Sequence, residues 1–344
     1  MNPEKVNIIV LNYNNYQDTI ECIDSILKLN YINYNLILID NASTNDSFDL
    51  LNDHLEYLKG KSPQYNYQLI EDKENDNLDD KVHIYLIKSN ENKGYASGNN
   101  IGIDISMRCT NCEYIWILNN DTVVDSESLT NQVNYFNSEL LQGINLGILG
   151  SKLLHYNDKN KIQAIAGSYD EIRGNTSHIG SNKNINEISQ IESDKIDYVI
   201  GASMLVSRNF IFNVGFLSTE YFLYFEELDW ALRAKAKKFS LGYCNDSLIY
   251  HKGGASVHYH ESNTNGEINS FNSINSITEY NYVKSKLIYT HKRSKKIKKN
   301  IFIYINILIY ILYNVKKGQF KYAYIILNAI YDFLTEKREL KYSK

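Results

Sequence analysis

Acidic side chains stand at three points of this 344-residue sequence where an apolar segment ends. Asp40 follows the apolar residues 36–39, Asp121 comes soon after residues 114–118, and a third acidic group follows residues 221–225, which are rich in aromatic side chains. A carboxylate beside polar loop atoms suits a hard divalent cation, which commonly bridges one or two carboxylates to substrate phosphates. These residues therefore indicate chemistry on a phosphorylated substrate.

The third acidic group offers a general base. Glu226, Glu227 and Asp229 cannot all lie on one helical face, and Asp229 stands four residues before Arg233, a spacing that favours an ion pair. A remaining carboxylate under aromatic cover would have a raised pKa and could take a proton from a substrate. The structural alternative is an acidic first helical turn that is stabilised by the helix dipole.

His251 follows the last predicted strand. A histidine there is either a metal ligand or a hydrogen-bonded loop residue, and the nearby His258 and His260 alone are poor evidence for zinc. A separate segment rich in Asn and Gly, residues 92–102, opens a predicted helix whose free N–H groups favour phosphate. The sequence has neither a G-x-G-x-x-G fingerprint nor a Walker P-loop, which disfavours a dinucleotide or ATP site.

Strand-like and helix-like segments alternate in the first part of the sequence. We predict strands at residues 6–11, 36–40, 84–87 and 114–118, and helices at residues 16–29, 46–58 and 95–107. This order predicts an α/β fold with a doubly wound, mostly parallel sheet flanked by helices. Ligands bind beyond the carboxyl ends of the strands in such sheets, which is where Asp40 and Asp121 stand.

The second half of the sequence is mixed, and we expect it to extend the same sheet. The predicted elements are helices at residues 126–136 and 226–237 and strands at residues 146–154, 198–206, 239–244 and 248–251. Residues 59–81 and 168–195 are polar and lack periodicity, so the first is predicted to be a surface excursion and the second to be irregular.

The end of the sequence is basic and then apolar. Residues 284–299 include eight Lys and Arg side chains, and residues 301–315 are almost wholly apolar. A helix that spans a bilayer needs about 20 apolar residues, so this segment is short. Two interpretations stay open, a helix on an anionic membrane surface and a core helix with a solvated basic approach. The alternating isoleucines of residues 301–309 also fit a strand, although the length favours a helix.

Composition narrows the class of protein. The apolar fraction of 43% allows a sizeable core, and the net charge of -4 argues against nucleic acid as a partner. Cys109 and Cys112 form one Cys-x-x-Cys pair without the second pair of a zinc ribbon, so we expect reduced thiols. No signal peptide is apparent at the start. We therefore expect a cytoplasmic location, peripheral on the inner face of the cell membrane if the C-terminal region binds lipid.

Taken in order, seven motifs resemble those of family 2 glycosyltransferases with the GT-A fold, most closely the rhamnosyltransferase-like branch of bacterial envelope-glycan enzymes. Each motif is modest alone, but their order and spacing over residues 6–256 are specific. The motifs are VLNYN (10–14), DNAS (40–43), NKGYASGNN (92–100), LNNDT (118–122), GASMLV (201–206), EELD (226–229) and HKGGAS (251–256).

The resemblance implies a role for each matching residue. Asp121 matches the last acidic position of the family's D-x-D metal motif, and His251 matches a histidine that helps to hold the metal or the diphosphate. Glu227 matches the catalytic base, where most relatives have Asp, and Asp229 is the alternative base. Asp40 would contact the base of the donor nucleotide. The full set of implied donor-binding residues is Asn12, Tyr13, Asp40, Asn92, Gly94, Asn99, Asn100 and Asn120.

The resemblance further implies a GT-A domain at residues 1–265, with a nucleotide-binding half at 1–125 and an acceptor half at 126–265, followed by a helical region at 266–344. The implied activity is inverting transfer of rhamnose or a similar sugar from a dTDP- or UDP-linked donor, with Mn²⁺ or Mg²⁺, to a glycan or lipid-linked saccharide acceptor. The alternatives are a degenerate nucleotide-sugar-binding subunit and a sugar-1-phosphate nucleotidyltransferase. The latter is disfavoured because residues 12–16 lack a Gly-rich basic loop.

Overall fold

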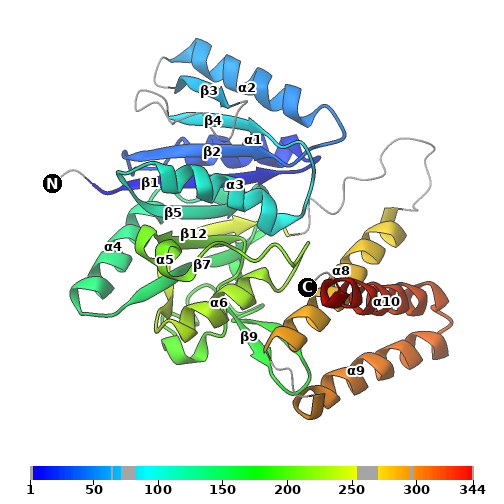
Figure 1. Ribbon diagram of the computed structural model, residues 1–344. Coiled ribbons are helices and arrows are strands. Elements are labelled where there is room, and N and C mark those ends of the chain that lie inside the picture. The colour runs from blue at the N-terminus through cyan, green and yellow to red at the C-terminus, as the bar shows by residue number, and fades with distance from the viewer. Residues whose placement is uncertain (1–2, 63–64, 71–82, 254–269, 294–296, 343–344) are drawn as a thin grey trace.

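A ten-stranded sheet forms the centre of the molecule, and helices cover both of its faces (Figure 1). The computed structural model describes residues 3–62, 65–70, 83–253, 270–293 and 297–342. Three helices at the C-terminal end stand to one side of the sheet domain. The predicted α/β fold, with its mostly parallel sheet and helical C-terminal appendage, is confirmed.

The elements of the first half are those that the apolar pattern predicts, with one additional edge strand. They are β1 (Lys5–Asn12), α1 (Tyr16–Ile26), β2 (Tyr34–Asp40), α2 (Ser47–Lys61), β3 (Tyr67–Ile70), β4 (Ile84–Lys88), α3 (Tyr95–Arg108) and β5 (Cys112–Asn119).

The second half continues the sheet with shorter and more varied elements. They are β6 (Thr122–Val124), α4 (Ser128–Leu141), β7 (Leu146–His155), β8 (Asp158–Ala164), β9 (Ala166–Asp170), β10 (Asn175–Ile179), a 3-10 turn (Ser193–Lys195), β11 (Ser203–Ser207), α5 (Arg208–Val214), α6 (Glu226–Ala236) and β12 (Ser240–His251).

The order of strands is β3-β4-β2-β1-β5-β11-β7-β12-β6, with β8 paired to β7. Adjacent strands are parallel in the part of the sheet ordered β3-β4-β2-β1-β5. Strand β11 runs antiparallel to both of its neighbours, β5 and β7. The register pairs Asn12 with Asp40 and Leu11 with Asn119. The polar residues at the ends of β1, β2 and β5 therefore meet at one edge of the sheet, as the parallel topology predicts.

The core has two layers, one on each face of the sheet, and the side chains of β1 point alternately into them. Val6, Ile8 and Val10 face the layer that contains the buried residues of α1, α2 and α4. Ile9 faces the layer that contains buried residues of α3, α5 and α6. Successive side chains of a strand point to opposite faces, so a strand that is apolar on both faces is buried between two layers of helices.

Two glycines of the 92–102 segment set how closely α3 packs on the sheet. A Cβ at Gly98 would lie 2.5 Å from a methyl carbon of Leu11, and one at Gly102 would lie 2.9 Å from Ile9. A larger residue at either position would have to displace Leu11 or Ile9, so these glycines allow close packing of α3 on β1.

Three predictions for irregular or separate segments are wrong. Residues 168–195 contain the β9–β10 hairpin, which was expected to be irregular. Part of the expected excursion at 59–81 forms the edge strand β3, and residues 71–82 lie outside the described chain. The two closing strands expected at 239–244 and 248–251 are one strand, β12, which bulges where its pairing with β7 shifts register between Cys244 and Leu248.

The C-terminal region folds as three helices: α8 (Ser270–Arg293), α9 (Ile297–Lys316) and α10 (Phe320–Tyr342). They share a small core of their own, formed by Val283, Leu287, Ile303, Ile307, Ile326 and Ala329. The helical prediction for residues 301–315 is therefore confirmed. The predicted boundary at 265/266 lies outside the described residues.

Within the described part of the chain, we find no helix that combines the length and the apolar character needed to cross a bilayer.

Candidate active site

The ends of β1 and β2 are joined by a buried network around Asp40. The carboxylate of Asp40 accepts hydrogen bonds from Asn12 Nδ2 at 2.8 Å, Ser43 Oγ at 2.6 Å and the Ser43 backbone N–H at 3.0 Å. Asn12 Oδ1 in turn accepts from Thr19 Oγ1 at 2.8 Å. Asp40 and Asn12 are both fully buried, so they shape the turn that follows β2. A direct contact of Asp40 with a nucleobase stays a prediction.

The Asn-rich segment before and within α3 also bonds to the protein itself. Asn92 Oδ1 accepts from Asn41 Nδ2 at 3.0 Å and from the Gly94 N–H at 2.9 Å. Asn100 clamps the backbone of Leu217 with two hydrogen bonds, of 2.8 and 3.1 Å. These amides fix the loop and the start of the helix.

Two further predicted donor residues differ in their surroundings. Asn99 is fully buried, and its Nδ2 donates to Tyr95 O at 3.0 Å. Its Oδ1 has no hydrogen-bond partner among the described residues. Tyr13, on the loop after β1, is partly exposed.

The residues after β5 point in two directions. Asn120 is buried, and its Nδ2 donates to Thr19 Oγ1 at 2.9 Å and to Asn15 O at 3.4 Å, on the side of α1. Asn119 lines a pocket on the other side of the strand end. The chain therefore brings Asn119 to the pocket and turns the predicted donor residue Asn120 away from it.

Asp121 and His251 form the candidate cation site. His251 Nε2 lies 3.2 Å from Asp121 Oδ1, and both side chains are largely buried. His251 Nδ1 lies 2.5 Å from Gln163 Oε1, an acceptor, so Nδ1 carries the proton in the neutral ring. Nε2 then presents a lone pair toward a carboxylate. That arrangement needs a proton or a cation between the two groups, and a buried carboxylate with an oriented imidazole suits a divalent metal.

The donor set fits a cation that is shared with a substrate. In the described ranges, no cluster of three or more His, Cys, Asp and Glu side chains could hold a metal. Two protein ligands suffice for Mg²⁺ or Mn²⁺ when waters and phosphate oxygens complete the coordination. His258 and His260 lie outside the described residues.

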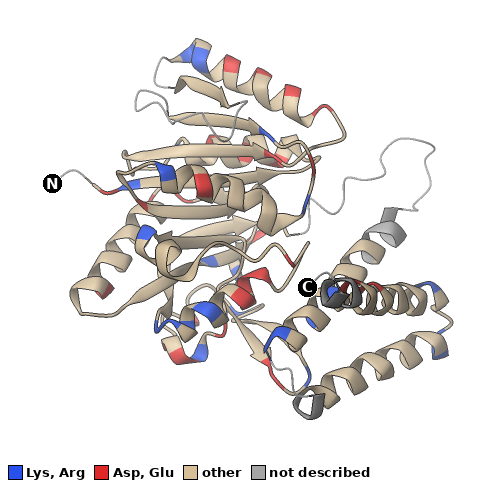
Figure 2. Ribbon diagram, in the orientation of Figure 1, with Lys and Arg blue, Asp and Glu red and all other residues tan. Residues whose placement is uncertain are grey.

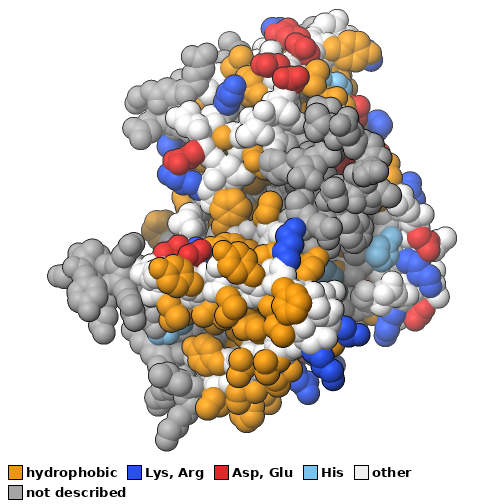
Figure 3. Space-filling view, turned by 90° about the vertical axis from the view of Figure 1, so that its right-hand side faces the viewer, with side chains coloured by type: hydrophobic (Ala, Val, Ile, Leu, Met, Phe, Trp, Pro, Cys, Tyr) orange, Lys and Arg blue, Asp and Glu red, His pale blue; other side chains and the backbone are white. Residues whose placement is uncertain are grey.

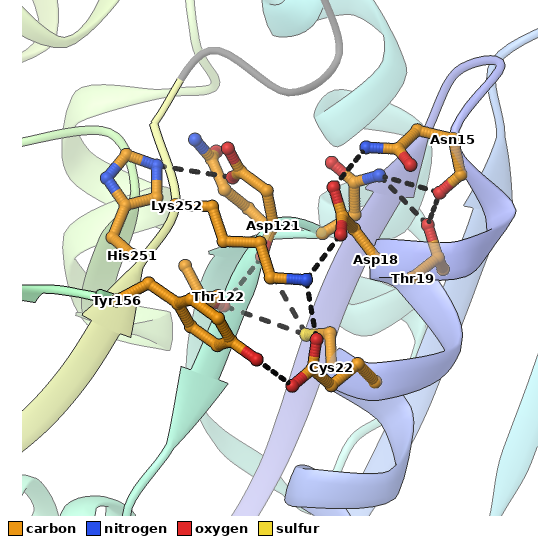
Figure 4. A network of polar contacts seen from close by, with 12 residues as sticks. Asn15, Asp18, Thr19, Cys22, Asp121, Thr122, Tyr156, His251 and Lys252 are labelled. Carbon is orange, nitrogen blue, oxygen red and sulfur yellow. Dashed lines mark hydrogen bonds and ion pairs between the residues drawn. The ribbon is translucent and has the colours of Figure 1, made fainter. Parts of the chain in front are cut away.

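Lys252 fastens this site to α1 (Figure 4). Its ammonium group contacts Asp18 and lies 2.5 Å from Glu21 Oε2, while Tyr156 donates to Glu21 Oε1 at 2.5 Å. Burial lowers the pKa of Lys252, but the hydrogen bonds and charges of Asp18 and Glu21 outweigh it and raise the pKa above its ordinary value. The backbone N–H of Lys252 also donates to Asp121 O at 3.0 Å. The end of β12, which carries His251, is therefore held in place on two sides.

A strained turn delivers the acidic helix to the pocket. Tyr224 and Phe225 have φ angles of 70° and 72°, in the left-handed region that non-glycine residues rarely occupy. Each costs on the order of 1–3 kcal/mol, so the surroundings must hold them. The Tyr95 N–H donates to Phe222 O at 2.9 Å, and Ser285 Oγ of α8 donates to Leu223 O at 2.8 Å.

Aromatic packing and one close approach complete this support. The rings of Tyr224 and Phe225 pack on Tyr282 of α8 with centroids 6.1 and 5.5 Å away. Gly94 has a φ of 93°, and a Cβ there would lie 2.1 Å from Phe222 O, so only glycine fits between α3 and the turn. The turn is thus fixed by α3 on one side and by α8 on the other.

The turn places Glu226 and Glu227 in a largely apolar environment. Glu226 is buried beside Glu227, Tyr95 is partly buried next to them, and Oε2 of each glutamate has no hydrogen-bond partner in the described structure. Burial raises the pKa of Glu227 to about 7, although the backbone N–H of Gly201 counteracts it. Burial and the neighbouring Glu227 hold the pKa of Glu226 well above its usual range. One of the two is therefore protonated near neutral pH, and Glu227 is poised to exchange a proton.

Asp229 has a different environment. It is buried, but Arg233 Nε lies 2.8 Å from its Oδ2 and Lys292 Nζ lies 3.1 Å from its Oδ1. Tyr221 OH also donates to Oδ1 at 3.3 Å. The predicted pair of Asp229 with Arg233 is confirmed. Asp229 is engaged by two cations and does not line the pocket that Glu227 lines, so this geometry favours Glu227 over Asp229 as a base.

One pocket of about 300 Å³ joins the predicted base to the cation site. Its walls include Glu226 and Glu227 of α6, Asn119 of β5 and His251 of β12, which are three separate segments. Sequence reasoning did not find Thr176 of β10 or Tyr282 of α8, because the hairpin β9–β10 and helix α8 were not expected there. It also did not single out Tyr95 of α3 or Tyr198, which line the same pocket. His178 of β10 lines the pocket as well.

A family model for "Glycosyl transferase family 2" matches residues 7–230, more than half of the chain. This chain belongs to glycosyl transferase family 2. The match includes the Asp40 turn, the α3 segment, Asp121 and the Glu226–Asp229 group, and it ends before His251.

One curated relative is the low-salt glycan biosynthesis hexosyltransferase Agl10 of Haloferax volcanii. The two sequences are 25% identical over 164 residues, which cover 47% of this chain and 49% of the relative. The match thus spans about half the length of that protein.

Solved structures with a similar fold extend the likeness beyond the part that matches the family 2 model. The mannosyltransferase PcManGT of Pyrobaculum calidifontis, solved with GDP-Man and Mn²⁺, is 12% identical, with a TM-score of 0.50 over 97% of this chain and 76% of that one. TarS 1–349 of S. aureus with UDP-GlcNAc is 11% identical, with a TM-score of 0.51 over 96% and 80%. GalNAc-T7 with UDP, GalNAc and Mn²⁺ is 12% identical, with a TM-score of 0.53 over 82% and 50%. At these identities the likeness establishes the GT-A fold.

Proposed function

We propose that this chain is an inverting glycosyltransferase that moves a sugar from a nucleoside-diphosphate donor to a saccharide acceptor. The observation that carries the proposal is the shared pocket of Glu227, with its pKa near 7, and His251, the partner of Asp121. A proton acceptor and a site for diphosphate charge are thereby placed within one reacting volume. Membership of family 2 supports the same assignment.

Glu227 would act as the general base. Its carboxylate takes the proton of an acceptor hydroxyl while that oxygen forms a bond to the anomeric carbon. The bond from the anomeric carbon to the diphosphate breaks, and its electron pair leaves with the nucleoside diphosphate. A single displacement of this kind passes through an oxocarbenium-like transition state, inverts the anomeric centre and needs no covalent intermediate.

Asp121 and His251 would hold a divalent cation, Mn²⁺ or Mg²⁺, together with phosphate oxygens of the donor. When bound, the cation supplies positive charge that stabilises the leaving diphosphate. Gln163 orients the imidazole, and Lys252 holds the end of β12, which carries His251, against α1. Two fold neighbours, solved with Mn²⁺ and with GDP-Man or UDP, support this part of the proposal.

The finer assignment follows the motifs. We propose a dTDP- or UDP-linked donor of rhamnose or a similar hexose, as in the rhamnosyltransferase-like branch, and a bacterial surface-polysaccharide or lipid-linked saccharide acceptor. Asn12, Asp40, Asn92 and Gly94 would shape the donor pocket. Helix α8 would border the acceptor side, since Tyr282 lines the same pocket as Glu227.

A donor screen tests the proposal. Purified protein is incubated with Mn²⁺ or Mg²⁺ and a panel of nucleotide sugars, and release of nucleoside diphosphate is measured. We expect metal-dependent release from one donor, and its loss in Asp121→Ala but not in Asp158→Ala, which changes a carboxylate on β8 outside the pocket. If no donor reacts, calorimetry with the bare nucleoside diphosphates decides. Absence of metal-dependent binding would contradict the proposal and favour a degenerate subunit.

A further inference from the structure

Helices α9 and α10 present a continuous apolar face to the outside of the molecule. Among the described residues, 14 of the 25 exposed large apolar side chains lie between positions 301 and 334. Figure 3 shows them covering the lower part of the molecular face that it views. A monomeric protein in water rarely exposes an apolar surface of this extent, so this face indicates a binding surface.

The exposed side chains follow the helical repeat. On α10 they stand at intervals of three and four residues, while Ala323, Ile326 and Ala329 of the same helix are buried against the small core. Each helix therefore has one face in the bundle and a second apolar face outside it. The exposed members are Ile301, Phe302, Ile305, Leu308, Ile309, Tyr310, Leu312, Tyr313 and Val315 on α9, and Phe320, Tyr324, Leu327, Tyr331 and Leu334 on α10.

Charge identifies the kind of partner. Residues 280–331 contain 11 Lys and Arg side chains and no Asp or Glu. Lys316, Lys317 and Lys321 are exposed where α9 turns into α10, at one end of the apolar face, and Figure 2 shows this turn in blue beside two largely uncharged helices. A cationic rim beside an apolar face complements an anionic lipid surface.

The acidic groups near this face have partners in the bundle. Tyr280 of α8 donates a hydrogen bond of 2.5 Å to Asp332, and Lys284 lies 2.7 Å from Glu336. Glu279 of α8 accepts a hydrogen bond of 3.4 Å from the hydroxyl of Tyr310. The exposed tyrosines of α9 and α10 also suit the boundary between lipid and water, because each has an apolar ring and a polar hydroxyl.

From these observations we propose that α9 and α10 dock on the surface of an anionic lipid bilayer. The apolar face enters the boundary between headgroups and acyl chains, and the lysines of the α9–α10 turn contact anionic headgroups. Docking does not rest on the proposed glycosyltransferase activity. It concerns a face that is separate from the 300 Å³ pocket, although α8 contributes to both regions.

Vesicle sedimentation with the full chain tests the docking. The probes are vesicles of phosphatidylcholine alone and vesicles that contain one third phosphatidylglycerol. We expect strong binding to the anionic vesicles only, and weaker binding as salt rises, because headgroup attraction is screened. Binding should fall about fivefold for each lysine removed in the series Lys316→Gln, Lys317→Gln and Lys321→Gln.

Matched variants distinguish docking through α9 and α10 from nonspecific hydrophobic adsorption to vesicles. Leu308→Ser combined with Leu312→Ser should lower vesicle binding by about tenfold or more, because both side chains are exposed and are not needed for the bundle core. Leu141→Ser and Phe212→Ser remove apolar side chains that are 90% and 83% exposed elsewhere, and they should leave binding unchanged. Circular dichroism establishes that each variant is folded.

Two results would overturn the proposal. The first is equal sedimentation of wild type and the Leu308→Ser, Leu312→Ser variant. The second is a wild-type protein that forms a stable dimer by light scattering and does not bind vesicles, while the Leu308→Ser, Leu312→Ser variant is monomeric. The second result would assign the face to another copy of the chain.

Discussion

The two halves of the site differ in how their polar groups are satisfied. At the ends of β1 and β2, Asp40 and Asn12 are fully buried and their hydrogen bonds go to other protein groups. In the pocket before α6, Glu226 and Glu227 each keep an oxygen without a hydrogen-bond partner in the described structure. Buried polar groups are usually paired, and because both glutamates line the pocket, their unpaired oxygens are available to a substrate there. The comparison separates residues that build the site from those that react in it.

Glu227→Gln should produce the largest effect. The amide keeps the size of the side chain but cannot accept a proton, so turnover should fall about 10²- to 10⁴-fold while donor binding is kept. Turnover is measured as nucleoside diphosphate release, and donor binding by calorimetry. Asp229→Asn is the control, because Asp229 is paired with Arg233 and Lys292 and should mainly affect stability. Near-normal turnover of Glu227→Gln would remove it from the role of base.

The pH dependence of kcat/KM should also report the ionisation of Glu227. Because the pKa of Glu227 is about 7, kcat/KM should rise about tenfold per pH unit below 7 and level off above it, if Glu227 acts as base. Folding has the opposite dependence. The folded state binds the proton more tightly than the unfolded state does, so Glu227 stabilises the fold most below pH 4.5 and loses this contribution as pH rises to about 7.

Thermal denaturation of wild type and Glu227→Gln between pH 5 and 8 measures that contribution. The wild type should lose stability relative to the variant as pH rises. An identical pH dependence of the two proteins would mean that the pKa of Glu227 is ordinary.

Asp40→Asn should mainly lower the free energy of unfolding. The amide cannot accept all the hydrogen bonds that Asn12 and Ser43 donate, and a buried donor without a partner costs about 1–3 kcal/mol. Denaturant titration should show this loss, with KM for the donor changed less than the stability. A large rise in KM without loss of stability would show that Asp40 contacts the nucleotide directly.

Asn119 and Asn120 offer the smallest and most local test. Asn120→Ala removes a hydrogen bond to Thr19 Oγ1 and should lower stability by about 1 kcal/mol. Asn119→Ala changes the pocket wall and should lower kcat/KM by several-fold at nearly wild-type stability. The reverse pattern, measured by the same two assays, would mean that the Asn120 side chain turns to the donor when it binds.

The fold was largely predictable from sequence, because β1, β2, β4 and β5 are buried on both faces and read as apolar runs. The hairpin β9–β10 was missed because it lies outside the main sheet and its second strand is largely exposed, so it carries little apolar pattern. The edge strand β3 has only four residues, of which one is buried.

The candidate site was predictable in its residue types but not in their orientation. The motifs pointed to Asp121, Glu227 and His251, and the structure places them in or beside one pocket. No local pattern could indicate that Asn119 faces this pocket while Asn120 turns to α1. Tyr282 was equally hidden, since it reaches the pocket only through the packing of α8 on the turn at residues 221–225.

Helix α8 has a consequence for how the two ends of the molecule influence each other. Its Tyr282 lines the pocket, its Ser285 holds the strained turn, and its apolar face packs under α9 and α10. Any effect of vesicles on nucleotide affinity must be matched by an equal effect of the nucleotide on vesicle affinity, because linkage between two binding events is reciprocal. Helix α8 contacts both regions, so a ligand that shifts α8 in the pocket would also change the affinity of the protein for a lipid surface.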